Sequence, residues 1–488
     1  MTTDNLKQRA VSGAFWYGGS RFAIQGLTWA ITILVARILT PGDYGLIGFA
    51  MLVGGVADLI NEIGIGAAII QRQDLDDEDL SAVFWFSMLF SLLIYLGAWL
   101  LSPWIAKFFN QPALTSVLRV SMLTFLLESL RIIPWNLLTK RLEFKHRSII
   151  EFIANIISAI TTLVMAYTGF GVWSLVWGML LRHAVLTIGC QCICPWWPRL
   201  RFTWSRLQKV LGFGLNVSGG QLAWYAYSNA DFLVVGKLLG QQLLGLYTMV
   251  WQLAMLPVDR IAAVVNQVAY PVYAELQHDD KKLKEYFLKI VSLIATVILP
   301  LYGGLFLVAE TAIPCLLGPK WLPIITPLKI MCGVGILMTF STLIPPIVMA
   351  KGRPDISLKY TLTCLLVMPL GFLGGARSGI TGVCWAWLIL YPQLVTIWYI
   401  TTRRLVGYQW RELVIAVQPA AISTVAMCTL VIFSRFLMTF CASGLIRLIT
   451  LVIVGIFSYI AVFIRVFKEQ ANETLKLFFR KRVAPNRL

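Results

Sequence analysis

Charged side chains interrupt several long apolar runs of the sequence. Arg21, Arg182 and Arg260 lie inside three of these runs, and Asp58 lies inside a fourth. A charge at the centre of a membrane costs about 2.5–3.5 kcal/mol on insertion scales, so such residues normally face protein or water. The flat guanidinium of arginine directs several donors at one phosphate group. These arginines therefore predict a site inside the membrane that attracts an anionic group, with phosphate as the best fit.

Each charge also has a purely structural interpretation. Arg21 could pair with Glu62 between helices, and Arg131 could pair with Glu128 on one face of a single helix. We expect the second pair to be structural, because it lies near a predicted membrane interface. His183 could relay protons, although a histidine packed inside a helix bundle is the commoner case.

Polar residues recur at helical spacing along the same runs. Tyr17, Arg21 and Gln25 share one face of the first run, and Asp58 and Glu62 share one face of the second. Because a polar face on an apolar helix turns towards protein or water, these faces predict a wet cavity. The candidate substrate-binding residues are Arg21, Gln25, Asp58, Glu62, Arg182, Gln221, Asp259 and Arg260.

Two further patterns could bind an ion. Asp231 lies near the end of an apolar run, where it could hold a coupling cation or could instead cap its helix or pair with Lys237. Cys190, Cys192 and Cys194 have a metal-like spacing, but alternate residues of a helix point to different faces. We therefore expect the cysteines to be small apolar filler, and we expect no metal site.

The composition indicates the elements that must hold these residues. Hydrophobic residues make up 58% of the chain and charged residues 13%, and the mean hydropathy is +0.76. A water-soluble chain of 488 residues could not bury so much apolar surface. A helix of about 20 mostly apolar residues crosses a bilayer, and helices satisfy their own backbone groups there. The sequence predicts an all-α integral membrane protein of about fourteen transmembrane helices, near residues 11–36, 44–70, 82–102, 114–138, 148–168, 171–194, 208–236, 244–270, 286–309, 322–349, 358–375, 379–402, 411–434 and 444–467.

Loop charges predict how these helices are oriented. Lysines and arginines gather in alternate loops, whereas the intervening loops hold single ones such as Lys107 and Lys237. Cytoplasmic loops are enriched in basic residues, so both termini should lie in the cytoplasm and the chain in the inner (plasma) membrane. The same enrichment accounts for the net charge of +18, and we expect no nucleic-acid binding.

An internal repeat divides the chain. Residues 35–39 and the following Gly45-Leu46 resemble residues 235–239 and Gly245-Leu246 at an offset of 200 positions. Six helices per half give both halves the same orientation, as in membrane proteins built from parallel repeats. This predicts two pseudo-symmetric six-helix lobes around a central cavity, plus two C-terminal helices. The predicted parts are a first lobe at 1–198, a cytoplasmic interfacial linker at 199–207, a second lobe at 208–404, the two further helices at 405–467 and a basic cytoplasmic tail at 468–488.

Several motifs together resemble one protein family. Residues 36–45 (ARILTPGDYG) resemble the opening motif of bacterial polysaccharide exporters, and residues 231–247 resemble the matching motif of their second half. Residues 317–321 (LGPKW) and 349–357 (MAKGRPDIS) resemble the colanic acid exporter (Wzx-type) branch. The resemblance extends over nearly the whole chain, and its family belongs to the multidrug/oligosaccharidyl-lipid/polysaccharide superfamily.

The resemblance implies a transporter and not an enzyme. It implies that the chain flips or exports a polyprenyl-pyrophosphate-linked oligosaccharide, as a repeat unit of exopolysaccharide, capsule or O-antigen, from the cytoplasmic to the periplasmic face by alternating access. The implied partners are an undecaprenyl-pyrophosphate-linked glycan and membrane lipids, with a polysaccharide polymerase and chain-length machinery as further candidates. The sequence holds no phosphate-binding Gly-x-x-x-x-Gly-Lys motif, so we expect no cofactor, and an ion gradient or the membrane potential would supply the energy. A multidrug or cation exporter of the same superfamily and a membrane glycan polymerase or ligase stay open as alternatives.

Overall fold

The computed structural model describes residues 26, 28–61, 69, 75–141, 143–199, 215–438 and 444–468. All regular elements among these residues are helical, which confirms the predicted all-α class. Ten described stretches are long and apolar enough to cross a membrane, and one of them, 354–406, contains two successive helices. Each of the fourteen predicted spans overlaps described helical residues, the first of them only over Thr28–Ile38.

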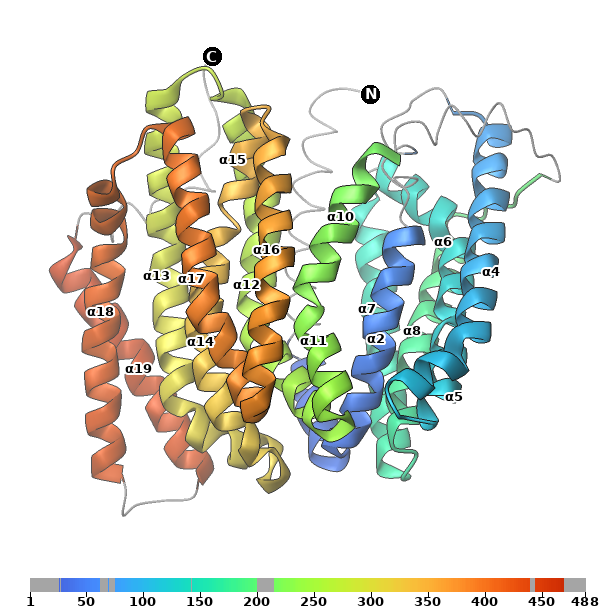
Figure 1. Ribbon diagram of the computed structural model, residues 1–488, viewed down its shortest axis with the longest axis horizontal. Helices are drawn as coiled ribbons and strands as arrows, with labels where there is room; N and C mark the ends of the chain where they lie inside the picture. Colours follow the sequence, from blue (N-terminus) through green and yellow to red (C-terminus); the bar gives the residue numbers. More distant parts are fainter. Residues whose placement is uncertain are drawn as a thin grey trace. The chain divides into compact units, whose positions relative to one another are not determined.

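The chain forms two compact units, residues 1–248 and 249–488. In the first unit, α7 packs along α8, and α4 and α8 both pack on α6 (Figure 1). The elements of this unit are α2 (Pro41–Asn61), α4 (Asp77–Phe108), α5 (Ala113–Ser121), α6 (Leu123–Lys140), α7 (Phe144–Tyr167), α8 (Val172–Ile193), α10 (Leu215–Ser228), α11 (Ala230–Val234), η1 (Val235–Leu239) and the start of α12 (Gln241–Glu275).

Local sequence sets several of these helix ends. The Asp76 side chain accepts a hydrogen bond from the backbone N–H of Asp79, and the Asp79 side chain accepts one from that of Asp76. This capping box satisfies donors that the first turn of α4 would otherwise leave unpaired. Between α7 and α8, Gly169 and Gly171 adopt φ values of 86° and 56°, a region that favours glycine. The Gly169-Phe170-Gly171 turn therefore joins α7 to α8.

The two segments matched by the repeat contact each other at the starts of α2 and α12. A Cβ atom on Gly45 would overlap the carbonyl oxygen of Gln241, and a Cβ on Gly245 would overlap that of Pro41. The Gln241 side chain also donates a hydrogen bond to the carbonyl oxygen of Gly42 at 2.8 Å. The paired glycines thus allow backbone-to-backbone contact between residues about 200 positions apart.

The residues that lead into the predicted linker pack against α4. Trp196 lies 5.8 Å from Phe84, measured between ring centroids. Trp85 Nε1 donates to the carbonyl oxygen of Arg199 at 2.9 Å, and the Arg199 backbone N–H donates to Ser81 Oγ at 3.0 Å. Residues 200–214, which include most of the predicted linker, lie outside the described residues.

The second unit is built around α13. This helix packs against α14 and α18, and α19 packs on α13 and α18. The two helices predicted as a C-terminal addition therefore dock on one helix of this unit, through a core that includes Met427, Leu451 and Phe463. The elements are the remainder of α12, α13 (Asp280–Ala312), η2 (Ile313–Leu317), η3 (Pro319–Ile324), α14 (Ile325–Ser341), α15 (Ile344–Ala350), α16 (Pro354–Gly375), η4 (Ala376–Ser378), α17 (Gly379–Val406), α18 (Trp410–Leu437) and α19 (Gly444–Val466).

Candidate functional site

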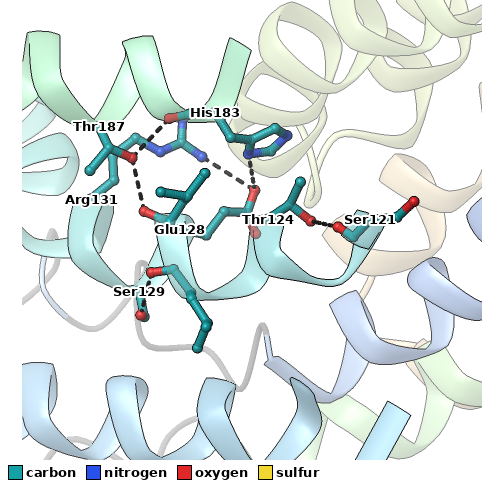
Figure 2. A network of polar contacts seen from close by, with 9 residues as sticks. Ser121, Thr124, Glu128, Ser129, Arg131, His183 and Thr187 are labelled. Atoms are coloured by element: carbon teal, nitrogen blue, oxygen red, sulfur yellow. Dashed lines mark hydrogen bonds and ion pairs between the residues drawn. The ribbon is translucent and has the colours of Figure 1, made fainter. Parts of the chain in front are cut away.

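A charged cluster joins α6 and α8 in the first unit (Figure 2). Glu128 Oε1 lies 3.3 Å from Arg131 Nη2 and 3.3 Å from His183 Nδ1. The side chains are 29% exposed for Glu128, 16% for Arg131 and 15% for His183. Thr187 Oγ1 lies 2.9 Å from the carbonyl oxygens of Leu127 and His183 and so bridges the two helices. One carboxylate therefore serves both a guanidinium and an imidazole.

Arg182 belongs to the same cluster and approaches it from α8. Its Nε donates to Asn155 Oδ1, on α7, at 3.2 Å. Its charge interacts with those of Arg131, Glu151 and Glu128. Among the described residues, its hydrogen bond goes to a neutral amide and not to a carboxylate. A guanidinium placed in this way keeps donors for an anionic ligand.

The cluster lies deep in its helices and not near a membrane interface, where the sequence placed the Arg131–Glu128 pair. Glu128 and Arg182 are near the middles of the apolar stretches 113–140 and 172–193. Arg131 and Arg182 balance the charges of Glu128 and Glu151. Arg182 can therefore offer its remaining guanidinium donors to an anion inside the membrane.

The structure combines residues that the sequence interpreted separately. The Arg131–Glu128 pair on one helix is confirmed, but it also meets the predicted binding residue Arg182 and the neighbouring His183. The residue types and spacings were visible in the sequence. The sequence did not show that α6 packs against α8, because neither helix carries a polar pattern that identifies its neighbour.

A second group of predicted residues lies where α2 meets α10. Tyr225 Oη donates to the carbonyl oxygen of Leu52 at 2.8 Å, and its ring fills the space that a side chain at Gly55 would need. The exposed Asp58 interacts electrostatically with Tyr225. The predicted polar face of α2, which carries Asp58, therefore meets Tyr225 of α10 at this point.

Two of the remaining predicted binding residues lie in the second unit, and the side chains of the others lie outside the described residues. Asp259 and Arg260 are adjacent and exposed on α12 in the second unit, where their charges interact. Arg21, Gln25 and Glu62 lie outside the described residues, as does the side chain of Gln221, whose backbone belongs to α10. Their assignments stay predictions.

Asp231, the predicted coupling-ion residue, is fully buried in α11. Tyr247 Oη donates to its Oδ2 at 2.5 Å, and the Phe232 backbone N–H donates to its Oδ1 at 2.9 Å. Lys237, its alternative partner, donates to the carbonyl oxygen of Phe108 at 2.5 Å. A cation at Asp231 would share its carboxylate with these protein donors, and the coupling role stays a prediction.

Several known proteins are similar to this chain in sequence. A family model described as polysaccharide biosynthesis protein matches residues 34–326. The lipopolysaccharide biosynthesis protein WzxC of Escherichia coli (strain K12) is 26% identical over 421 residues, which cover 84% of this chain and 85% of that protein. The succinoglycan biosynthesis transport protein ExoT of Rhizobium meliloti (strain 1021) is 23% identical over 398 residues, covering 81% and 78%.

Solved structures share the fold. The lipid II flippase MurJ in an inward closed conformation has a TM-score of 0.76 and 14% sequence identity, covering 93% of this chain and 99% of that chain. An inward-facing multidrug resistance MATE family transporter of the MOP superfamily has a TM-score of 0.62 and 17% identity, covering 79% and 94%. At these identities the two structures support the architecture alone.

Proposed function

The chain belongs to the polysaccharide biosynthesis protein family, and from this membership we propose that it flips a polyprenyl-pyrophosphate-linked oligosaccharide across the inner membrane. The family match over residues 34–326 is the observation that carries the proposal. It confirms the family resemblance found in the sequence. The relatives named for lipopolysaccharide and succinoglycan biosynthesis support a glycan cargo, and the word transport in one of those names supports movement rather than synthesis.

The charged cluster of α6 and α8 supplies chemistry that suits such a cargo. A pyrophosphate is anionic, and Arg182 offers guanidinium donors at membrane depth. Glu128 holds Arg131 nearby and keeps the cluster close to neutral when no cargo is bound. Binding then needs no covalent step, and we propose that the chain acts as a transporter and not as an enzyme.

We propose that the cargo moves from the cytoplasmic to the periplasmic face, the direction that the family resemblance implies. The basic loops and both termini would lie on the cytoplasmic side, where the cargo enters. Membrane lipids surround the prenyl tail in this scheme. A polysaccharide polymerase and chain-length machinery would act on the exported product, and we include them as proposed partners.

The alternative of a multidrug or cation exporter shares the fold but not the charge pattern. A cation carrier needs an excess of carboxylates at its binding site. The described cluster instead balances Glu128 and Glu151 with Arg131 and Arg182, so it has no such excess.

Gene deletion in the native host tests the proposed function. We expect loss of one surface polysaccharide and accumulation of its lipid-linked precursor on the cytoplasmic side. Normal surface glycan in a strain without a redundant exporter would refute the proposal. A missing precursor together with lost glycan would point to a synthetic enzyme instead.

Arg182 variants test the site in the same strain. Arg182→Ala should lower export about tenfold, the effect of losing a hydrogen bond to a charged group, and Arg182→Lys should restore part of it. Arg119→Ala is the matched control, because Arg119 packs on Trp99 and donates to Ser102 outside the cluster. Full export by Arg182→Ala at normal protein level would remove Arg182 from the binding site.

A further inference from the structure

A cavity of about 370 Å³ opens between α16 and α17 in the second unit. The two helices touch tightly at their other ends, where a Cβ on Gly375 or Gly382 would overlap the backbone of the opposite helix. Near the start of α16 and the end of α17 larger side chains hold the helices apart. The lining residues used below are Arg353, Asp355, Lys359, Tyr360, Trp398 and Arg404.

Two stacked aromatic rings form the inner wall of this cavity. The ring centroids of Tyr360 and Trp398 are 3.7 Å apart with an interplanar angle of 20°. Both residues are 8% exposed. The Trp398 indole N–H is buried without a hydrogen-bond partner among the described residues. An unpaired buried donor is unfavourable, and a rotation of the Trp398 ring that turns this N–H towards the cavity would let it donate to a ligand.

Positive charge dominates the mouth of the cavity. Arg353 Nε and Nη2 donate to the two carboxylate oxygens of Asp355 at 2.9 and 3.1 Å, and Lys359 lies 3.8 Å from the same group. Arg404 is exposed and has no hydrogen bond or ion pair with any described residue. Three cations therefore face one carboxylate.

The helix ends do not cancel this charge. The mouth lies at the start of α16, where the helix dipole adds partial positive charge. The end of α17 carries the opposite partial charge, but Arg403 and Arg404 occupy its last turn. The mouth is therefore suited to an anion.

The cavity is lined by cations at its mouth and by apolar side chains farther in. Leu394 and Ile397 line it farther along α17 from the cationic end, beside the aromatic pair. The cavity lies at one end of the apolar stretch 354–406, at the level where a bilayer changes from headgroups to hydrocarbon. A ligand that fills it needs an anionic head and an apolar chain, and free phosphate would leave the apolar wall uncovered.

We propose that this cavity binds the phosphate headgroup of an anionic membrane phospholipid. Arg404 and Lys359 contact the phosphate, the Trp398 indole donates to a lipid oxygen, and the first acyl carbons lie along Leu394 and Ile397. Basic pockets at the ends of membrane helices bind anionic headgroups in this manner. The site does not depend on the identity of the transported cargo.

Native mass spectrometry of the purified full-length protein tests the site. Dioleoyl phosphatidylglycerol and dioleoyl phosphatidylcholine have the same chains, so their difference isolates the headgroup. We expect tighter binding of phosphatidylglycerol, and a loss of about tenfold in its affinity in the double variant Lys359→Gln/Arg404→Gln. The control Lys281→Gln/Arg465→Gln removes two exposed cations elsewhere and should bind like the unchanged protein.

A second variant separates ligand binding from folding. Trp398→Phe keeps an aromatic ring against Tyr360 but removes the N–H, and it should weaken phosphatidylglycerol binding about threefold. Thermal unfolding without lipid shows whether either pocket variant is misfolded. Equal phosphatidylglycerol affinity in the pocket double variant and its control would overturn the proposal.

Two competitors identify the source of the phosphate. Inorganic phosphate should not displace phosphatidylglycerol, and displacement by it would overturn a lipid site in favour of a free anion. Undecaprenyl phosphate should bind no better than phosphatidylglycerol. A clear preference for it would assign the cavity to the transported lipid class and overturn the assignment to a bilayer phospholipid.

Discussion

At the scale of single residues, Glu128 shows how one carboxylate can organise several charges inside a membrane. It pairs with Arg131 on its own helix and with His183 across to α8. The first contact follows from a three-residue spacing and was predicted. The second depends on how two helices meet, and it places Arg182 within the same electrostatic environment.

Removing this carboxylate should destabilise the protein. Glu128→Gln leaves the charge of Arg131 without its partner, and we expect the free energy of unfolding to fall by about 1–3 kcal/mol. The thermal unfolding midpoint in detergent measures the effect, with the exposed Glu285→Gln on α13 as control.

The double variant Glu128→Gln/Arg131→Gln should recover most of the lost stability, because no unpaired charge remains. If the stability losses of Glu128→Gln and Arg131→Gln simply add up in the double variant, the pair contributes no coupling energy. That result would contradict the role given to Glu128.

At the scale of elements, the close contact between α2 and the start of α12 depends on glycine. Gly45 and Gly245 each face a backbone carbonyl of the opposite segment, so a side chain at either position cannot be relieved by changing a rotamer. The predicted repeat marks both glycines by an offset of 200 positions. The two repeat segments are therefore similar in sequence and also contact each other, each through its own glycine.

A single methyl group should disturb this contact. Gly45→Ala places a Cβ against the carbonyl oxygen of Gln241, and we expect the free energy of unfolding to fall by about 1–3 kcal/mol. Gly97→Ala on α4 is the matched control, since a Cβ there meets no atom within 4 Å. Folded yield after membrane extraction and the unfolding midpoint compare the two variants, and equal values would rule out a tight crossing.

At the scale of the whole molecule, the first compact unit extends beyond the predicted first lobe. It ends at Thr248 and includes α10, α11 and the start of α12, which the sequence assigned to the second lobe at 208–404. The contacts of Tyr225 and Gln241 with α2 account for the extension. The lobes that would move during alternating access stay a prediction.

The predicted orientation can be tested with cysteine labelling. Phe170→Cys lies in the exposed α7–α8 turn, which should face the periplasm, and Lys281→Cys lies at the exposed start of α13, which should face the cytoplasm. A membrane-impermeant maleimide should label the first in intact cells and the second only after permeabilisation, above the background of the parent protein. The reverse pattern would contradict the predicted topology, in which both termini lie in the cytoplasm.

The sequence by itself determined the helical class, the positions of the predicted spans and the family. Apolar runs of membrane length can only be helices in lipid, and the motifs at 36–45 and 231–247 keep their order along the chain. Tertiary structure decided which residues of different helices meet. Glu128 and His183, Tyr225 and Gly55, and Tyr360 and Trp398 come together through helix packing. Lipid-soluble helices are apolar on most faces, so their sequences fix where each crosses the membrane but not which neighbour it contacts.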